Sequence, residues 1–211
     1  MGIVAGDITG ERPLDEAKNV TERELFRVST QLFKEKGYRG TSMRDISAAL
    51  GIKTSSIYHY INSKEELLKK IALKGMNMLL DAGKRISAEQ ISPTEKLRKL
   101  VESHIKLICE NLDLFTVTLR ELTPSNAASF WEEIVEHRDQ YEKIVRGIIS
   151  EGKKLGAFRE IDERMAGFAL LGMINWIIRW YNPGGSKSPA EIAALWFEIF
   201  IWGIKRAPAD K

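Results

Sequence analysis

The stretch TSMRDISAALGIKTSSIYHY, residues 41–60, carries the pattern that decides the fold. Its first half predicts a short helix over about Ser42 to Ala49 that Gly51 ends, and its second half predicts another over about Lys53 to Tyr60. Neither helix is long enough to be stable alone, so both must pack against a longer one. The tight turn at residues 50–52 would set the two helices at an angle, which is the arrangement of a helix-turn-helix.

Longer helices are expected on both sides of this stretch. Residues 21–24, Thr-Glu-Arg-Glu, have the form of an N-terminal capping box, and the apolar periodicity after them predicts a helix that ends at Gly37. Residues 63–66, Ser-Lys-Glu-Glu, have the same form and predict a long helix that extends to about Ala88. The first of these long helices supplies the surface on which the two short helices would pack.

The remainder of the chain also has helical punctuation. No segment alternates apolar and polar residues for long enough to form a strand, so the predicted fold class is all-α. N-terminal hydroxyl and proline residues, and glycines near the expected ends, divide this part into separate helices. Five more helices are therefore expected, at about residues 92–110, 112–122, 127–154, 162–181 and 188–205. They bring the expected number to about nine.

Charge is unevenly distributed along the chain. Residues 1–20 contain 2 Lys or Arg and 4 Asp or Glu, residues 21–75 contain 11 and 6, and the remainder is balanced. A basic segment on a neutral remainder suggests a polyanion-binding head on a body with another task. We therefore divide the chain into an aperiodic, flexible N-terminal arm over residues 1–20, a head over 21–66 and a larger helical body over 67–211.

Composition excludes several classes of protein. The 211 residues are 44% hydrophobic and 29% charged, which excludes a wholly disordered chain. No apolar run is long enough for a transmembrane helix, and none near the N-terminus has the length of a signal peptide, so a cytoplasmic protein without a membrane partner is expected. Cys109 stands alone, which excludes an intramolecular disulfide and a cysteine-based zinc site.

No sequence motif indicates catalysis. The chain has no Gly-x-Ser-x-Gly elbow, no glycine-rich phosphate loop before a helix, and no histidine or asparagine pattern that would activate Cys109. Glu133 and His137 are spaced i,i+4, but two ligands on one helix make a weak metal site, and a solvated pair is the simpler interpretation. His104, on an amphipathic helix, is interpreted as structural. We expect no enzyme activity, no metal and no cofactor.

The segment 53–60 has the side chains that a helix in a DNA groove needs. Ile57 and Ile61 would point inward, which leaves a cation, hydroxyls and aromatic rings with polar tips to face outward. Such groups suit base edges and phosphates, and small residues at the leading end allow a close approach to the groove floor. The outward residues are Lys53, Thr54, Ser55, Tyr58 and His59.

Several separately spaced motifs over about residues 21–70 resemble the TetR family of bacterial transcriptional repressors. The motifs are LFKEKGY (32–38), TSMRDI (41–46), LGI (50–52), IYHY (57–60) and SKEEL (63–67). The resemblance implies a three-helix DNA-binding domain, here residues 21–66. It also implies a larger C-terminal helical domain, here residues 67–211, that binds a small molecule and forms a homodimer.

The resemblance also implies particular DNA contacts. Thr41 or Ser42, and also Lys64, would donate to phosphates at helix N-termini, where unpaired N–H groups and the helix dipole favour an anion. Arg44 would reach the DNA backbone or a base, although a solvated surface position is an equal alternative for Arg44 and His59. The remaining contacts would come from Lys53, Thr54, Ser55 and Tyr58, with His59 and Tyr60 toward the phosphates.

The last two expected helices are apolar around most of their circumference. Two such hairpins would form a four-helix bundle across a two-fold axis, whereas an ordinary monomer core is the alternative. A dimer would place its two recognition helices about one DNA turn, ~34 Å, apart on a palindromic operator. The family resemblance favours the dimer.

The middle helices would enclose an effector pocket. Its candidate lining consists of aromatic residues at helical spacing and of arginines among apolar neighbours, although a plain core and internal ion pairs would give the same pattern. The candidates are Phe115, Leu119, Arg120, Phe130, Trp131, Ile134, Arg138, Met173, Trp176, Arg179 and Trp180.

Residues 114–122 and 172–185 look like the ligand domain of one TetR subgroup. Its members are similar to repressors of fatty-acid and sterol-ring catabolism that release DNA on binding acyl-coenzyme A thioesters. This similarity implies an apolar cavity for the acyl chain, with Arg120, Arg138 or Arg179 for the carbonyl or the coenzyme phosphates. The expected protein is thus a repressor that an acyl-CoA effector releases from DNA.

Two alternatives stay open at this point. One is a repressor that senses an uncharged or cationic lipophilic, drug-like compound. The other, from a different class, is a non-specific architectural DNA binder, although the neutral body and the single compact basic head argue against it.

Overall fold

A computed structural model describes residues 20–205, and this part of the chain is helical. It contains nine α-helices and one short 3₁₀ helix, and within these residues the only extended pairing is an isolated antiparallel bridge between Phe158 and Lys205. The all-α fold class is confirmed. The predicted arm, residues 1–20, lies outside the described residues apart from Val20. None of the helices in residues 20–205 is long and apolar enough to span a membrane.

The head is built from α1 (Glu22–Lys36), α2 (Met43–Leu50) and α3 (Thr54–Ile57). The predicted caps are present: Thr21 Oγ1 accepts a hydrogen bond from the N–H of Glu24 at 3.2 Å, and Ser42 forms a reciprocal capping box with Asp45. Gly37 and Gly51 end α1 and α2 at φ values of 77° and 69°. A residue without a Cβ adopts these values at little cost, so the two glycines permit the tight turns of the head.

The third helix is shorter than the sequence predicts. Its predicted range was Lys53 to Tyr60, but α3 ends at Ile57 and residues 58–60 form turns. The N–H groups of Tyr58, His59 and Tyr60 each donate to a carbonyl three residues earlier, which tightens the chain. These turns place Ile57 and Ile61 in the head core and bring the chain to Ser63, where the next helix begins.

Helix α4 (Lys64–Ser87) joins the head to the body. Ser63 Oγ accepts from the N–H of Glu66 at 3.0 Å, as the predicted capping box requires. The reciprocal bond is absent from the described contacts, because the Glu66 carboxylate instead accepts from the backbone and side chain of Asn62, both at 2.8 Å.

The body contains α5 (Pro93–Glu110), α6 (Leu112–Glu121), α7 (Trp131–Lys154), α8 (Glu163–Asn175), the 3₁₀ helix η1 (Trp176–Arg179) and α9 (Pro189–Ile204). The predicted start of α7 at about residue 127 and the predicted end of α8 at about residue 181 are wrong. Residues 127–130 form turns that Ser129 holds against α4 by two hydrogen bonds to Glu65. After Asn175 the chain tightens so that Ile177 is buried while Trp176 and Trp180 stay exposed.

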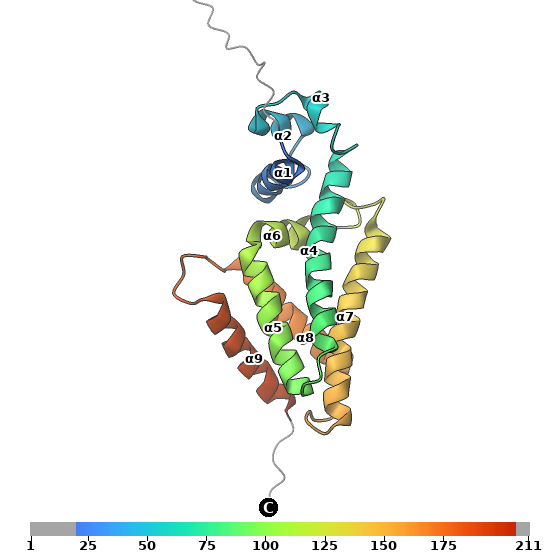
Figure 1. Cartoon of the computed structure of the whole chain (residues 1–211), viewed down its shortest axis with the longest axis vertical. Coiled ribbons are helices and arrows are strands. Elements are labelled where there is room, and N and C mark those ends of the chain that lie inside the picture. The colour runs from blue at the N-terminus through green and yellow to red at the C-terminus, as the bar shows by residue number, and fades with distance from the viewer. Residues whose placement is uncertain (1–19, 206–211) are drawn as a thin grey trace, which may run out of the picture.

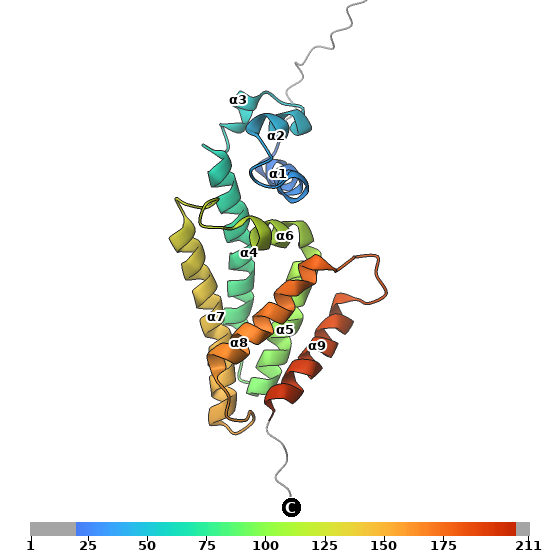
Figure 2. The same ribbon diagram turned by 180° about the vertical axis from the view of Figure 1, so that it is seen from behind.

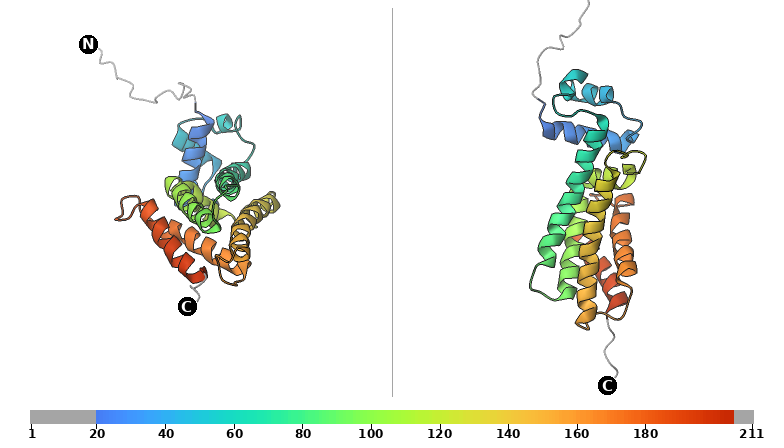
Figure 3. Two further views of the ribbon diagram at one scale, coloured as in Figure 1. Left: turned by 60° about the horizontal axis from the view of Figure 1, so that its bottom comes forward. Right: turned by 90° about the vertical axis from the view of Figure 1, so that its right-hand side faces the viewer.

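The helices form an elongated molecule with the head at one end (Figure 1). Helix α4 leaves the head and runs beside α7 along the long axis of the body (Figure 3). Helix α6 lies across the end of the body that faces α1, and α8 and α9 lie together on one side of the body (Figure 2).

Two apolar cores meet at α6. The first contains head residues such as Phe33, Ile46 and Ile57 and extends to Val117 of α6. The second fills the body and contains Phe115 of the same helix. Since side chains on two faces of α6 belong to different cores, a displacement of α6 would change the packing of both cores.

Candidate DNA interface and ligand cavity

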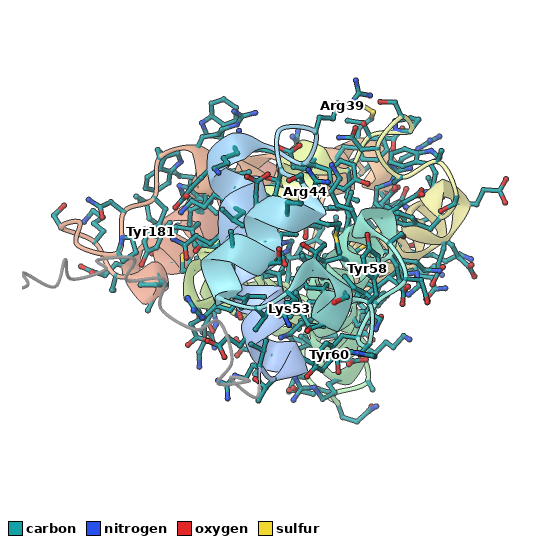
Figure 4. All side chains as sticks on the ribbon, turned by 90° about the horizontal axis from the view of Figure 1, so that it is seen from above. Arg39, Arg44, Lys53, Tyr58, Tyr60 and Tyr181 are labelled. Carbon is teal, nitrogen blue, oxygen red and sulfur yellow. The ribbon has the colours of Figure 1, made fainter. Side chains whose placement is uncertain are left out.

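One end of the head exposes polar and aromatic side chains from α2 and α3. Arg44, Lys53, Ser55, Tyr58 and His59 are all exposed. Figure 4 looks onto this end and shows Arg44, Lys53 and Tyr58 on the surface that faces the viewer. The Tyr58 side chain is 51% exposed, which is unusual for so large an aromatic group and leaves its ring accessible to a duplex.

Thr41 is placed where it cannot make the predicted phosphate contact. Its side chain is only 1% exposed, and its hydroxyl lies 2.8 Å from the carbonyl oxygen of Gly37 and 3.2 Å from that of Leu32. The hydroxyl therefore joins the end of α1 to the start of α2. The prediction for Thr41 is corrected accordingly, and of the pair Thr41 and Ser42 only Ser42 remains at the surface.

Ser42 is exposed, but Asp45 engages its hydroxyl. Ser42 Oγ accepts from the N–H of Asp45 at 3.1 Å and donates to the Asp45 carboxylate at 2.5 Å. Hydrogen bonds from Ser42 and the nearby Lys36 ammonium hold the pKa of Asp45 below its usual range. A phosphate at this helix end would therefore meet first-turn N–H groups beside a carboxylate.

Thr54 and Tyr60 have internal partners. Thr54 is half-buried, and its hydroxyl shares a hydrogen bond of 2.8 Å with Ser47 of α2, which fixes the angle between α2 and α3. The Tyr60 hydroxyl donates to the carbonyl oxygen of Val20 at 2.6 Å. Both side chains hold the head together, and Tyr60 still exposes part of its ring.

Lys64 is also tied into the head. Its Nζ donates to the carbonyl oxygens of Tyr38 and Thr41, each at 2.8 Å, and lies 4.3 Å from the centre of the Tyr38 ring. Partial burial lowers the pKa of this ammonium. Lys64 therefore connects the start of α4 to the loop between α1 and α2, in addition to the phosphate contact predicted for it.

An apolar cavity of about 220 Å³ lies in the body between α4, α5, α6, α7 and α8. Among the residues predicted to bind a ligand, Phe115, Leu119, Trp131, Ile134 and Arg138 line it. The lining also contains Met76, Leu79, His104, Thr118, Leu122, His137, Tyr141, Leu171 and Asn175, which sequence reasoning did not select. Most of these additional residues are ordinary members of apolar helix faces, so no sequence signal distinguishes them from a plain core.

The other predicted ligand residues lie away from this cavity. Arg120 is exposed on α6, and Phe130 belongs to the core that the head shares. Met173 packs against the body core on another face of α8. Trp176, Arg179 and Trp180 are exposed around η1, where the tightened chain turns them outward. The Arg179 guanidinium lies 5.9 Å from the centre of the Trp176 ring, so it has an aromatic neighbour rather than a buried anion.

A histidine and a tyrosine form a buried polar pair in the cavity wall. His104 Nδ1 of α5 and the Tyr141 hydroxyl of α7 are 3.1 Å apart, and their rings meet edge to face. Burial lowers the pKa of His104 to about 3, against a smaller opposing effect of Asn175, and raises the pKa of Tyr141. Both side chains are therefore neutral at physiological pH.

A larger surface groove of about 1360 Å³ adjoins the cavity between α7 and α8. Trp131, Arg138, Leu171 and Asn175 line both hollows, so the groove leads to the cavity. Its charged side chains are four cations and four carboxylates: Arg138, Lys143, Arg146 and Arg164, and Glu132, Glu136, Asp139 and Glu142. Arg138 and Arg146 pair with carboxylates at 3.3 and 3.4 Å, whereas among the described residues Lys143 and Arg164 have no ion-pair partner.

Helix α6 connects the cavity to the head through polar contacts near both of its ends. Lys34 Nζ of α1 lies 2.6 Å from the Asp113 carboxylate at the start of α6. Near the other end, the N–H of Tyr38 donates to the Glu121 carboxylate at 3.1 Å. Phe115, Thr118 and Leu119, between these contacts, line the cavity. Helix α6 therefore contacts both the cavity and the head.

Large apolar side chains are exposed on α8, η1 and α9, and Figure 2 shows α8 and α9 on the same side of the body. They are Met165, Phe168, Trp176, Trp180, Leu195, Ile199 and Trp202, and the Trp202 side chain is 73% exposed. A group of large exposed apolar side chains is a candidate interaction surface. Ala166, Leu170, Ile177 and Ile192, on the same two predicted helices, are buried in the monomer and pack in its core.

No metal centre is apparent in the part of the chain that the structure covers, since no group of three or more potential ligands occurs there. The Glu133 carboxylate pairs with Lys69 at 2.6 Å, and His137 Nδ1 lies 2.8 Å from the carbonyl oxygen of Glu133. The pair that sequence spacing suggested as a weak metal site thus has other partners.

Comparison with known protein families decides the classification. Residues 25–71 match the family model described as bacterial regulatory proteins of the tetR family, and residues 90–204 match the tetracyclin repressor-like C-terminal domain. The chain belongs to the TetR family. It is therefore a DNA-binding transcriptional regulator and not an enzyme, as the sequence motifs of the head indicate.

Individual relatives extend over nearly the whole chain. The transcriptional repressor KstR2 of Rhodococcus jostii is 29% identical over 196 residues, which cover 91% of this chain and 96% of KstR2. The crystal structure of PfmR from Thermus thermophilus, a TetR family regulator, superposes with a TM-score of 0.76 at 34% identity and covers 86% of this chain and 99% of PfmR. The structure of AibR in complex with isovaleryl coenzyme A and operator DNA has a TM-score of 0.73 at 27% identity, with coverages of 84% and 96%.

Proposed function

We propose that this TetR family regulator is a repressor that binds a palindromic operator as a homodimer and is released by an acyl-CoA thioester with a compact acyl group. The observation that carries the effector assignment is the apolar cavity that opens into a polar groove, where Lys143 and Arg164 lie among further cations and four carboxylates.

The exposed end of the head is the DNA-binding surface. Arg44, Lys53, Ser55, Tyr58 and His59 combine cations, a hydroxyl and aromatic rings on a convex surface that a major groove can accept. The phosphates that flank the groove would meet Ser42, Lys64 and Tyr60, with the first-turn N–H groups of α2 and α4 contributing donors. A head of this size reads too few base pairs alone, which favours a dimer.

The apolar face of α8 and α9 is the dimer surface. Ile199 is 59% exposed and Trp202 is 73% exposed, so both side chains gain most of their burial only when a second molecule covers them. A two-fold axis through this face would join two α8–α9 hairpins in a four-helix bundle. The two heads would then be held at a fixed spacing.

An acyl-CoA has the two chemical parts that the adjoining hollows accept. Its acyl chain is apolar, and the cavity of about 220 Å³ is smaller than the ~300–1,000 Å³ typical of small-molecule pockets, which suits a compact acyl group. The coenzyme carries phosphates, for which Lys143 and Arg164 in the groove are available. The similarity to AibR, whose solved complex contains isovaleryl coenzyme A and operator DNA, supports the same class of effector.

The cavity lining argues against a cationic group of a ligand inside the cavity. Among the described residues that line it, Arg138 is the one cation with a fixed charge, and no carboxylate is present to pair with a ligand cation. The groove outside has four carboxylates beside its four cations, so its charge does not discriminate between the two effector classes.

Release follows from a competition between two arrangements of α6. An acyl chain that fills the cavity displaces Phe115, Thr118 or Leu119, and the contacts of Asp113 and Glu121 transmit this displacement to α1. The long helix α4 then swings, and the two heads leave their one-turn spacing on the DNA. The effector shifts this equilibrium only by the ratio of its affinities for the two arrangements.

Operator release measures the proposal directly. DNA fragments selected by the purified protein supply the operator, and fluorescence anisotropy is then recorded with acyl-CoAs of four to ten carbons, free coenzyme A and the matching fatty acids. We expect release by a short acyl-CoA and not by its two fragments. A saturating series of acyl-CoAs that leaves operator affinity unchanged would exclude this effector class.

A paired ligand separates the roles of cavity and groove. Acyl-pantetheine carries the same thioester without the nucleotide phosphates. The double substitution Lys143→Ala and Arg164→Ala should weaken acyl-CoA binding by about ten-fold or more and leave acyl-pantetheine binding within two-fold. Equal losses for both ligands would show that the two cations act on protein stability rather than on phosphate.

A further inference from the structure

The cavity wall contains a polar atom whose partner is missing. His104 is buried, and no hydrogen bond of good geometry reaches its Nε2 among the described residues, although the Asn175 side chain is near enough to interact with the imidazole. Buried side-chain nitrogen atoms are nearly always hydrogen-bonded, so an orphan in a cavity wall indicates that a group entering the cavity supplies the bond. The orphan Nε2 is thus a candidate contact for a ligand.

The neighbouring tyrosine indicates which kind of partner is missing. The Tyr141 hydroxyl keeps its proton because burial raises its pKa, and His104 Nδ1 is the one acceptor recorded for it in the described structure. If Tyr141 donates to Nδ1, the neutral imidazole carries its own proton on Nε2. The opposite tautomer would leave the Tyr141 proton without an acceptor. His104 therefore presents a neutral N–H donor to the cavity.

A second polar side chain lies beside this donor. Asn175, the last residue of α8, is close enough to His104 to favour the protonated imidazole, and it lines both the cavity and the groove. The two groups therefore lie where the groove leads into the cavity. Most of the remaining wall at this depth is apolar, with Leu79, Phe115 and Ile134 among its members.

We propose that His104 and Asn175 recognise the thioester carbonyl of the effector, whose oxygen accepts from His104 Nε2–H and from the Asn175 side-chain amide. The inference rests on the acyl-CoA function proposed above and adds the specificity-determining residues. With the carbonyl held at this junction, the acyl chain occupies the cavity and the coenzyme lies along the groove. An acyl chain without the carbonyl leaves a buried N–H donor unsatisfied, so the pair selects thioesters over other lipophiles.

The test compares two ligands that differ only at the carbonyl. Hexanoyl-CoA has the thioester C=O, and S-hexyl-CoA is the corresponding thioether. We expect the wild-type protein to bind hexanoyl-CoA about ten- to a hundred-fold more tightly in calorimetry, because the thioether leaves the donor unpaired. His104→Phe should bring this ratio to within about three-fold of one, whereas Asn175→Leu, which leaves the His104 donor in place, should reduce the ratio only in part.

The controls separate loss of recognition from loss of folding. Leu79→Ala changes the apolar wall of the same cavity and should weaken both ligands while it keeps their ratio. His104→Gln retains a side-chain amide donor and should restore part of the ratio. Circular dichroism and operator affinity without effector show for each variant whether the fold is intact.

The outcomes distinguish failure of the carbonyl assignment from failure of the acyl-CoA function. If hexanoyl-CoA and S-hexyl-CoA bind the wild type equally well, the carbonyl assignment is wrong while the acyl-CoA function stands. If the ratio is large but survives both His104→Phe and Asn175→Leu, other residues recognise the carbonyl. If neither ligand binds, the acyl-CoA function itself fails.

Discussion

The side chain of His104 shows how burial determines the charge of a single residue and through it the acid sensitivity of the protein. In the unfolded chain a histidine has a pKa of about 6.5, whereas burial lowers the folded value to about 3. Between these two pH values the unfolded state binds a proton that the folded state does not. His104 therefore leaves stability unaffected above pH 6.5 and lowers it as the pH falls below that value.

This linkage predicts a measurable difference between two pH values. Between pH 7.5 and 5.5 the His104 contribution to the free energy of unfolding should fall by about 1.4 kcal/mol, and His104→Gln should remove this part of the loss. Urea denaturation at both pH values measures it. Leu79→Ala, in the same cavity, should lower stability by similar amounts at both values. An identical pH response of the wild type and His104→Gln would contradict the buried neutral imidazole.

Substitution of Tyr58 tests the proposed DNA-binding surface. Its ring is 51% exposed and packs little within the head, so Tyr58→Ala should leave thermal stability nearly unchanged. Operator affinity at fixed salt should fall ten-fold or more, because a large contact with the duplex is lost. Leu155→Ala, exposed at the far end of α7, is the matched control in the same anisotropy titration. Operator affinity that survives Tyr58→Ala would remove this residue from the interface.

Lys64 needs a different interpretation from Tyr58. Because its ammonium joins the carbonyls of Tyr38 and Thr41, Lys64→Ala should lower both the melting temperature and operator affinity. A lost phosphate contact would also reduce the slope of log affinity against log salt by about one, which a purely structural lysine would not do. The salt dependence, measured beside the melting temperature, therefore distinguishes the two roles.

Sequence reasoning at the level of single residues is limited by what a one-dimensional pattern contains. Thr41 and Ser42 are adjacent hydroxyl residues at one helix start, and only the packing of α1 against α2 shows that Thr41 is buried. His104 is one polar residue on an apolar helix face, which is typical of a structural histidine. Its importance depends on Tyr141 and Asn175, which come from two other helices.

At the scale of elements, caps made the helix starts predictable. Ser42, Ser63, Ser92 and Ser188 each accept a bond from the backbone three residues later, and each was a predicted start. The wrong boundaries lie where tertiary contacts decide: the turns after Ile57 and the 3₁₀ segment after Asn175 have no cap signal. The 3₁₀ segment also turns Trp176, Arg179 and Trp180 outward. The cavity lining that helical spacing predicted for these three residues is therefore wrong.

Substitutions in α6 test whether this helix couples the cavity to the head. The isosteric double substitution Asp113→Asn and Glu121→Gln weakens its contacts with Lys34 and the Tyr38 N–H and leaves its apolar packing in place. Operator affinity without effector should stay within about three-fold of wild type. The reduction in operator affinity caused by a saturating acyl-CoA, typically five- to 150-fold for a coupled pair of sites, should fall to below about three-fold.

The control for this prediction lies on α5. Glu102→Gln removes an ion pair with Arg98 within that helix and should leave effector-dependent release unchanged. Full release in the α6 double variant would show that coupling reaches the head through α4 alone.

At the scale of the whole molecule, the charge of the head and the adjoining first half of α4 differs from that of the rest of the chain, in agreement with a DNA-binding end. The positive excess lies in residues 21–75, and the exposed end of the head is where a duplex would approach. The position of the cavity could not be predicted in the same way. It depends on how five helices surround it, and Phe115 and Phe130 look equally suitable in the sequence although only Phe115 lines it.

The exposed apolar face of α8 and α9 gives the last prediction. Ile199→Glu together with Trp202→Glu places two carboxylates where a second copy would bury apolar side chains, and desolvating them is costly enough to prevent association. Since both side chains are mostly exposed in the single molecule, helical content should be retained. Sedimentation at micromolar concentration should then show a monomer. Operator affinity should fall by a hundred-fold or more, because each head binds only one half-site.

Leu155→Glu adds a charge at an exposed position outside this face and should remain dimeric. If the double variant still sediments as a dimer and binds the operator normally, the two-fold axis must pass through another surface.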